Sequence, residues 1–305
     1  MSNKSFDDLL DTITASRKKN ALQKILRHNN ICKIWIGGTQ NDRYDYPYRL
    51  VPADKATERI RDSAQELMLD SSINDPSLTN RDVIEKAIEL DVQWVIPKDY
   101  WGDIERTHES IIEFLDLYDN SDCRAKIIIP MQPPHDKHYL KYEDFYAQFS
   151  HFAIGGLKDA GAEKQIKAAE TFRDVVGDHK WIHGLGMGCS KKIINALREK
   201  DPFLDSIDAG TFETAPGQYG KVAGNDWIQH SFDYPSGDEI ATLTAIQMEY
   251  LAYQANYQLT PFANEFNKEK PDEQPDPNQS TLSEAWETPN STDQEASQNK
   301  VNELL

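Results

Sequence analysis

Short apolar runs rich in β-branched residues recur along most of the chain, and segments with helical spacing lie between them. Such runs are typical of strands that are buried on both faces of a parallel sheet. From the second run onward, the starts are 26, 34, 25, 29 and 24 residues apart, which leaves room for a helix after each strand. The pattern predicts strands at residues 31–37, 66–72, 92–97, 126–132, 151–157, 180–186 and 204–208.

Three of the intervening segments place apolar side chains three and four residues apart, as on one face of a helix. These segments span residues 79–90, 105–117 and 190–198, and the last begins with Ser190, a residue type that caps helices. We also expect a helix over residues 5–28, before the first strand, and another over residues 238–257 that closes the domain.

Repeated strand–helix units with right-handed crossovers build a parallel sheet. Seven strands and a weak eighth at residues 226–232 favour an α/β fold of the closed (β/α)8 TIM-barrel type over an open, doubly wound sheet. No G-x-G-x-x-G loop follows the first strand, which also disfavours a dinucleotide-binding fold. We therefore expect an N-terminal helix (residues 1–30), a catalytic barrel (31–264) and a tail (265–305).

The tail is rich in Pro, Asp, Glu, Gln, Ser and Asn. We expect it to be disordered, because it has too little apolar surface to offset its ordering entropy. It carries 10 acidic and 3 basic residues, a net charge of −7, so the rest of the chain holds −11 of the formal −18. An acidic body disfavours nucleic-acid binding over the whole surface. Either a local basic patch binds nucleic acid, or the acidic surface is an adaptation to high salt.

The sequence has no stretch near the roughly 18 apolar residues that a membrane span needs, and its N-terminus lacks the apolar core of a signal peptide. We therefore expect a cytoplasmic protein with no membrane partner. Cys32, Cys123 and Cys189 are far apart and form no C-x-x-C pair, so we expect neither a disulfide framework nor a zinc knuckle.

Polar residues follow the predicted strands at their carboxyl ends, where barrel enzymes carry their chemistry. They are Asp70, Asp99, Gln132, Gly155, Gly156, His183 and Asp208, with Asp205 on the last strand. Paired carboxylates suit glycosidic chemistry, in which one attacks the anomeric carbon and the other moves protons. An amide and a main-chain N–H could read the O6 edge of a purine, while an Asp accepts from its N1–H and amine. A metal site is the alternative, but His183 has no second His at ligand spacing.

The order of these motifs resembles the tRNA-guanine transglycosylase superfamily, and most closely its viral and phage relatives that insert 7-deazaguanines into DNA. His151-Phe-Ala-Ile-Gly-Gly-Leu157 resembles the family's G-Y-A-I-G-G-L, and Gln132 matches the Gln of its I-V-Q-G-G motif. Residues 69–72 are similar to the family's D-S-G-G segment, and residues 95–99 to its strand that ends in a base-binding Asp. Residues 182–186 are similar to its M-G-V-G turn, and residues 205–208 to its D-M-F-D motif. The resemblance spans about half the chain, residues 66–208.

The resemblance implies a role for each matched residue. Asp208 would be the nucleophile that displaces guanine and forms a covalent glycosyl intermediate, and Asp70 the general acid/base for the incoming base. Asp99 would bind the N1–H and amine of the base, and Gln132 with the N–H of Gly156 its O6. Gly155, Leu157, His183 and Ser71 complete the implied substrate-binding set, with the main chain of Leu157 facing the 7-substituent. The resemblance implies no cofactor.

The sequence also departs from the family. The C-x-C-x-x-C zinc motif with a later His is absent, and Ala-Gly-Thr-Phe-Glu follows Asp208 where the tRNA enzymes have an Arg-containing turn. The zinc subdomain supports RNA binding in those enzymes, so its loss favours DNA over tRNA as the acceptor, together with a free 7-deazaguanine base. A viral origin would place the protein in the host-cell cytoplasm, in a role such as restriction evasion. A base in a duplex would have to be flipped out or presented on a single strand.

Several readings stay open. The same exchange on tRNA is the nearest rival, followed by a non-catalytic accessory barrel subunit and an unrelated metal-dependent hydrolase; a homodimer is also open. Two cation groups could track phosphates, and several aromatic residues could stack on a base, although each could equally be a solvated face or loop packing. The cations are Arg17, Lys18, Lys19, Lys24 and Arg27, then Lys191, Lys192, Arg198 and Lys200; the aromatics are Trp101, Phe212, Tyr44, Tyr46 and Tyr48.

Overall fold

The computed structural model describes residues 32–37, 46–71, 75, 77–199, 203–210, 221–223, 229–231, 248, 251, 252 and 255. The helix expected at 5–28 and the tail at 265–305 lie outside these residues. Among them, no helix is long and apolar enough to cross a membrane.

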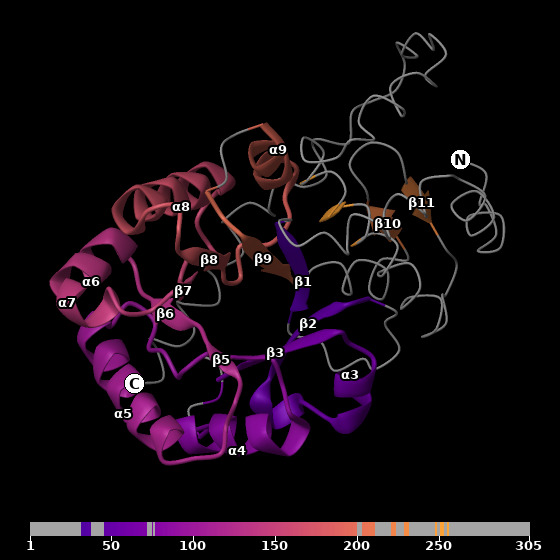
Figure 1. Ribbon diagram of the computed structural model, residues 1–305. Coiled ribbons are helices and arrows are strands. Elements are labelled where there is room, and N and C mark those ends of the chain that lie inside the picture. The colour runs from indigo at the N-terminus through magenta and orange to yellow at the C-terminus, as the bar shows by residue number, and fades with distance from the viewer. Residues whose placement is uncertain are drawn as a thin grey trace, which may run out of the picture. The chain divides into compact units, whose positions relative to one another are not determined.

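Nine parallel strands form one sheet in the order β5-β4-β3-β2-β1-β9-β8-β7-β6. The two edge strands, β5 and β6, follow each other along the chain with only Ile128 between them, and the Ile128 N–H donates to the Val95 carbonyl at 2.9 Å. The sheet is therefore a nearly closed α/β barrel of the TIM type (Figure 1). The strands are β1 Lys33–Gly37, β2 Tyr48–Pro52, β3 Glu66–Asp70, β4 Trp94–Val95, β5 Lys126–Ile127, β6 Ile129–Met131, β7 His151–Ile154, β8 Trp181–Gly184 and β9 Ser206–Ala209.

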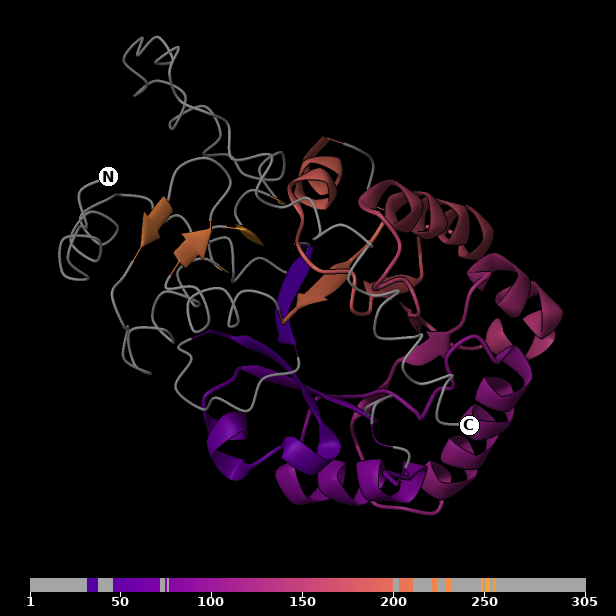
Figure 2. The ribbon, with the colours of Figure 1, turned by 180° about the vertical axis from the view of Figure 1, so that it is seen from behind.

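Helices cover the outside of the barrel between the strands, as Figure 2 shows from the opposite side. Side chains at the starts of two of them satisfy main-chain N–H groups that would otherwise lack partners: Thr79 and Asp82 form a capping box on α4, and Asp103 caps α5. The helical elements are η1 Ala53–Lys55, α3 Glu58–Asp62, α4 Asn80–Leu90, α5 Ile104–Asp119, α6 His135–Lys141, α7 Glu143–Tyr146, α8 Ala162–Val176 and α9 Lys191–Glu199.

All seven predicted strand runs contain strands of the barrel, but the prediction of the eighth was wrong. The missing strand is β2, between β1 and β3. The expected region at 226–232 instead contains β11 Gln229–Ser231, which pairs antiparallel with β10 Lys221–Ala223 in a separate two-stranded sheet. Arg49 interrupts the apolar pattern of β2 yet is fully buried, so the strand looked like part of a polar loop.

Alternate residues of the strands face the barrel interior, and the others pack under the helices. Polar and aromatic side chains occupy much of the interior. At the amino ends of the strands, Lys33 pairs with Glu66, which also accepts from Nε1 of Trp94 at 2.8 Å. The Trp94 and Trp181 rings stack with their centroids 5.4 Å apart. This packed layer fills the barrel interior at the amino ends of the strands.

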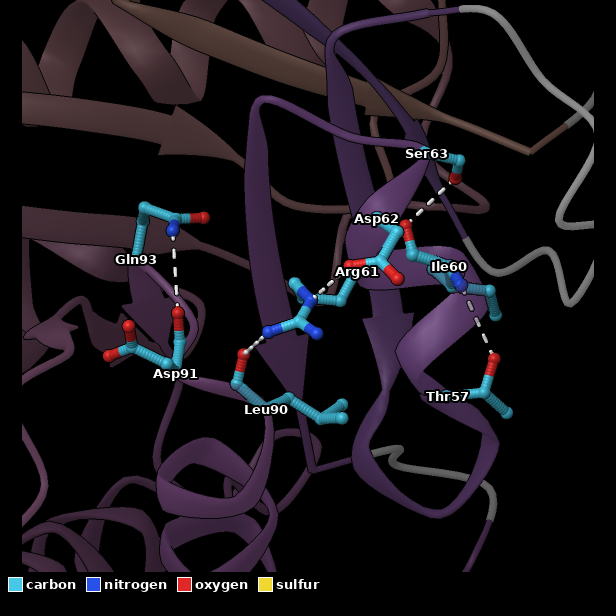
Figure 3. Close-up of polar contacts among 8 residues, drawn as sticks. All are labelled: Thr57, Ile60, Arg61, Asp62, Ser63, Leu90, Asp91 and Gln93. Carbon is cyan, nitrogen blue, oxygen red and sulfur yellow. Dashed lines mark hydrogen bonds and ion pairs between the residues drawn. The ribbon is translucent and has the colours of Figure 1, made fainter.

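The loops at the amino ends of the strands are tied together by structural contacts (Figure 3). Arg61 donates from Nη1 to the Leu90 carbonyl at 3.3 Å and from Nε to Asp62 at 2.6 Å, which links α3 to the end of α4. At the start of α3, the Ile60 N–H donates to Oγ1 of the N-cap residue Thr57 at 3.3 Å. Contacts at this end of a barrel generally serve stability, whereas the carboxyl end carries function.

Part of the helix expected at 238–257 is also described. Met248, Leu251, Ala252 and Ala255 are helical and buried, and their spacing puts them on one helix face. The prediction of a helix is confirmed at these positions.

Candidate functional site

Most of the predicted site residues lie at the carboxyl ends of the barrel strands. Asp70 ends β3, Gln132 follows β6, Gly155 follows β7 and Asp208 lies in β9. Because all of these strands run parallel in one barrel, their carboxyl ends meet at one mouth. Asp205 does not join them, because it precedes β9 and pairs with Arg173 at 2.6 Å.

Asp99 and Gln132 form a buried pair. Nε2 of Gln132 donates to Oδ2 of Asp99 at 2.6 Å, and Oε1 of Gln132 accepts from the Gly102 N–H at 2.9 Å. Burial raises the pKa of the Asp99 carboxyl, although the hydrogen bond from Gln132 opposes that rise. Nε2 carries two hydrogens, so its second hydrogen and the other Asp99 oxygen can meet a ligand.

Two histidines of α6, which the sequence interpretation missed, hold the backbone beside this pair. The Gln132 N–H donates to Nδ1 of His138 at 2.9 Å. Nε2 of His135 lies 2.8 Å from the Gly155 carbonyl, to which it must donate because a carbonyl only accepts. The two histidines are three residues apart in the sequence, a spacing that places them on one helix face and could have revealed their shared role.

A Cβ would fit at Gly155 but would collide with neighbouring side chains at Gly156. A Cβ on Gly155 would lie 3.8 Å from Oδ2 of Asp99, so this backbone passes close to the buried pair. Gly156 has a φ of +72°, and its Cβ would meet Pro133 at 2.9 Å and Trp101 at 3.2 Å. Glycine at 156 therefore satisfies both the left-handed backbone and the close approach of two rings.

Leu157, which follows the two glycines, is part of the core. Its side chain is buried, and its carbonyl accepts hydrogen bonds from Nε2 of Gln165 and from the Ala160 N–H, each at 2.9 Å. This carbonyl is thus already engaged in the fold.

Asp208 lies at the centre of a second polar group. Its Oδ1 accepts from the Gly186 N–H at 2.6 Å and lies 3.2 Å from Nε2 of His183. Nδ1 of His183 lies 2.6 Å from Oγ of Ser206. Both nitrogens of this fully buried ring are therefore engaged, so His183 contacts Asp208 instead of presenting a free nitrogen to a substrate.

The loop after β8 joins the two polar groups. The side chain of Leu185 lies 3.7 Å from the Cβ position of Gly155, which in turn is close to Asp99. The next residue, Gly186, donates to Asp208. Asp99 and Asp208 are therefore linked through two consecutive residues of one loop.

Asp70 and Ser71 lie at the carboxyl end of β3. Asp70 is partly exposed at the end of β3. Ser71 is fully buried, and its Oγ forms no hydrogen bond with any of the described residues. A buried hydroxyl without a partner is costly, which makes Ser71 a candidate donor to a ligand.

The aromatic candidates divide into three kinds. Tyr46 and Tyr48 are buried in the core, and Tyr46 donates to the Ile34 carbonyl at 2.6 Å, so neither ring is available to stack on a base. Trp101 is 62% exposed beside Gly156. Tyr44 and Phe212 lie outside the described residues.

The structure describes only part of the two cation groups that could bind phosphates. Within the second group, Lys192 pairs with Glu163 at 2.9 Å. The first group, residues 17–27, and Lys200 lie outside the described part of the chain.

Among the residues that the structure describes, no three His, Cys, Asp or Glu side chains gather as a metal site. No protein-family model matches the chain, and a search of curated proteins finds no match either.

Proposed function

We propose that this protein exchanges guanine in DNA for a 7-deazaguanine base through a covalent intermediate on Asp208. The observation that carries the proposal is the arrangement of two polar groups at one barrel mouth: a buried Asp99–Gln132 pair suited to a purine edge, and a held carboxylate at Asp208. The motif order from Asp70 to Asp208 supports the same assignment.

The Asp99–Gln132 pair suits guanine because their remaining hydrogen-bonding groups match its edge. Oδ1 of Asp99 would accept from N1–H and the exocyclic amine, while the second Nε2 hydrogen of Gln132 would donate to O6. A site built to pair these groups discriminates strongly against bases that lack them, because its own buried groups would be left unsatisfied. Ser71 offers a further donor to the ligand.

The proposed reaction has two displacements. In the first, a carboxylate oxygen of Asp208 bonds to C1′ of the nucleotide as the C1′–N9 bond breaks, and the bonding pair leaves with the guanine, which takes a proton from water. In the second, Asp70 removes a proton from N9 of the incoming 7-deazaguanine, and this nitrogen displaces Asp208 from C1′. This is the retaining, double-displacement logic of glycosidases applied to a nucleoside.

DNA is the proposed acceptor because the sequence lacks the zinc motif of the tRNA enzymes. The proposal treats the N-terminal helix (residues 1–30) and the acidic tail (265–305) as additions to a full (β/α)8 barrel, in a cytoplasmic protein. The same exchange on tRNA is the second candidate, since the base-reading groups would serve either acceptor.

The direct test is to incubate the protein with labelled guanine or 7-deazaguanine and with single-stranded DNA, duplex DNA or tRNA in parallel. We expect label to enter DNA, and the Asp208→Asn variant to show neither exchange nor a covalent adduct. Incorporation into tRNA alone would move the proposal to the second candidate. Normal exchange by Asp208→Asn would remove Asp208 as the nucleophile, and no label in any acceptor would refute the proposed function.

A further inference from the structure

Ser206, His183 and Asp208 form a buried chain of hydrogen bonds inside the barrel. Ser206 and Asp208 are two residues apart on β9 and so face the same side, and His183 on β8 is the register partner of Ser206. The ring of His183 also stacks on that of Trp181, with 6.0 Å between the centroids and 7° between the planes. Strand register and ring stacking thus fix the imidazole in position.

The chemistry of the three groups determines which atom holds each proton. A carboxylate only accepts, so Nε2 of His183 must carry the hydrogen that faces Oδ1 of Asp208. In a neutral ring Nδ1 is then an acceptor, and the Ser206 hydroxyl donates to it across 2.6 Å. Asp208 therefore selects the Nε2–H tautomer of His183, and the Ser206 hydroxyl, which can donate or accept, holds the other ring nitrogen.

The two oxygens of Asp208 differ in their surroundings. Oδ1 is held by His183 and by the Gly186 N–H. Among the described residues, no donor reaches Oδ2. Oδ2 instead lies 2.6 Å from the position that a Cβ on Gly37 would take. A side chain at position 37 would collide with this oxygen, so glycine is required there for Oδ2 to keep its place.

We infer that Oδ2 of Asp208 is the attacking oxygen and that His183 is its positioning residue, through the chain that begins at Ser206. This inference rests on the proposed function and deepens it. In the first displacement Oδ2 bonds to C1′, and Oδ1 becomes the carbonyl oxygen of the ester while His183 and Gly186 continue to donate to it. In the second displacement the bonding pair returns to Oδ2, and the same donors stabilise the carboxylate as it leaves.

A pair of His183 variants separates this role from packing. In His183→Gln the side-chain Nε2 occupies nearly the place of the imidazole Nε2 and can still donate to Asp208, whereas the shorter side chain in His183→Asn reaches only the place of Nδ1. We expect His183→Asn to lower kcat and the rate of adduct formation by about 10- to 100-fold with KM nearly unchanged, as for a lost hydrogen bond to a charged group. His183→Gln should recover most of this loss. Equal rates in the two variants, or a change confined to KM, would overturn the positioning role.

Gly37 tests the choice of oxygen. Gly37→Ala should prevent adduct formation, whereas Gly161→Ala should not, because a Cβ at 161 meets nothing within 4 Å and the backbone φ there is −61°. Thermal unfolding should show a folded barrel in both variants. Normal adduct formation by a folded Gly37→Ala protein would overturn the assignment of Oδ2.

A readout without turnover keeps this inference separate from the proposed function. Nitrogen-15 shifts of the His183 ring should show the Nε2–H tautomer in the wild type and lose that preference in Asp208→Ala, whereas Ser206→Ala should keep it. An Nδ1–H ring in the wild type would overturn the chain even if exchange occurs. If the ring is Nε2–H but the protein forms no adduct with any nucleic acid, the hydrogen bonds from Ser206 to Asp208 are supported. The proposed function and the attack by Oδ2 are then both overturned.

Discussion

The main-chain N–H of Gln132 donates to Nδ1 of His138 at 2.9 Å, and this bond requires the imidazole to be unprotonated at that nitrogen. Nε2–H of the neutral ring then donates to the Tyr146 hydroxyl at 3.0 Å, whose own hydrogen is left for Nδ1 of His108 at 2.9 Å. Gln132, the proposed base-reading residue, is thus held in place by a buried, neutral histidine.

This relationship predicts a loss of stability in acid. Burial, with smaller contributions from His108 and His135, lowers the pKa of His138 from 6.5 to about 4. Between these values the unfolded chain binds a proton that the folded protein does not, so the free energy of unfolding falls as the pH drops, by about 3 kcal/mol for the full shift. Urea unfolding from pH 7 to pH 4 measures this fall. His138→Asn keeps an acceptor for the Gln132 N–H but cannot titrate, so it should show a smaller fall; equal slopes would contradict the prediction.

Asp99 predicts the opposite trend with pH. Its carboxyl has a raised pKa because of burial, so its contribution to stability is fully present below the unfolded value of 3.8 and is lost as the pH rises through the folded value. Base binding should strengthen over that same rise, because only the ionised carboxyl accepts from both N1–H and the amine. Calorimetric titration with guanine across pH should show this gain.

The Asp99→Asn variant provides the comparison. It should lose guanine affinity by about 10-fold or more. The amide of Asn has one acceptor oxygen where the carboxylate has two, and its NH₂ group donates instead of accepting. The exposed Asp159→Asn, close to the same mouth, should bind as the wild type does. Undiminished binding by Asp99→Asn would exclude Asp99 from base reading.

The positions of the site residues could be predicted from the sequence better than their contacts. Strand ends in a parallel barrel share one mouth, so Asp99, Gln132 and Asp208 could be placed there from the apolar runs alone. The direct bond between Asp99 and Gln132 joins loops 33 residues apart, and no local pattern encodes it. The strand β2 escaped prediction because Arg49 is buried there against the usual preference of charged residues for solvent.

Asp70 should be required for the second displacement. Asp70→Asn removes the group that takes the proton from the incoming base, and we expect exchange to slow by about 10²- to 10⁴-fold. Guanine release and adduct formation should be less affected, so the adduct should accumulate in a gel assay. Asp62→Asn, an exposed carboxyl at the opposite end of the barrel, serves as the matched control. Unchanged exchange by Asp70→Asn would assign the proton transfer to another group.

Trp101 should contribute to binding of the acceptor strand. Its indole is exposed at the rim, and the turn that carries it is fixed by the bond from the Gly102 N–H to Gln132 and by the bond from the Asp103 N–H to the Tyr100 carbonyl at 3.0 Å. The target base would lie deeper, at Asp99, so a neighbouring base is the one within reach of the ring. Stacking contributes about 1–3 kcal/mol per base, so Trp101→Ala should raise KM for DNA by roughly 5- to 150-fold.

Trp101→Phe keeps a flat ring and should retain most of this affinity, and neither variant should change the affinity for free guanine. Fluorescence titration with an oligonucleotide and steady-state kinetics measure the two effects. A loss of guanine affinity in Trp101→Ala would place the ring on the target base instead.

The pairing of β1 with β9 has a consequence for synthesis of the protein. Trp35 and Asp208 are register partners across this seam, which joins the first and last strands of the barrel. On the ribosome, Asp70, Asp99 and Gln132 emerge well before β9 can dock. A partly made chain therefore already holds these proposed site residues but has nothing to fix the proposed nucleophile. Reactivity toward nucleic acid would then appear only when the barrel closes, and unfinished chains could not form covalent adducts.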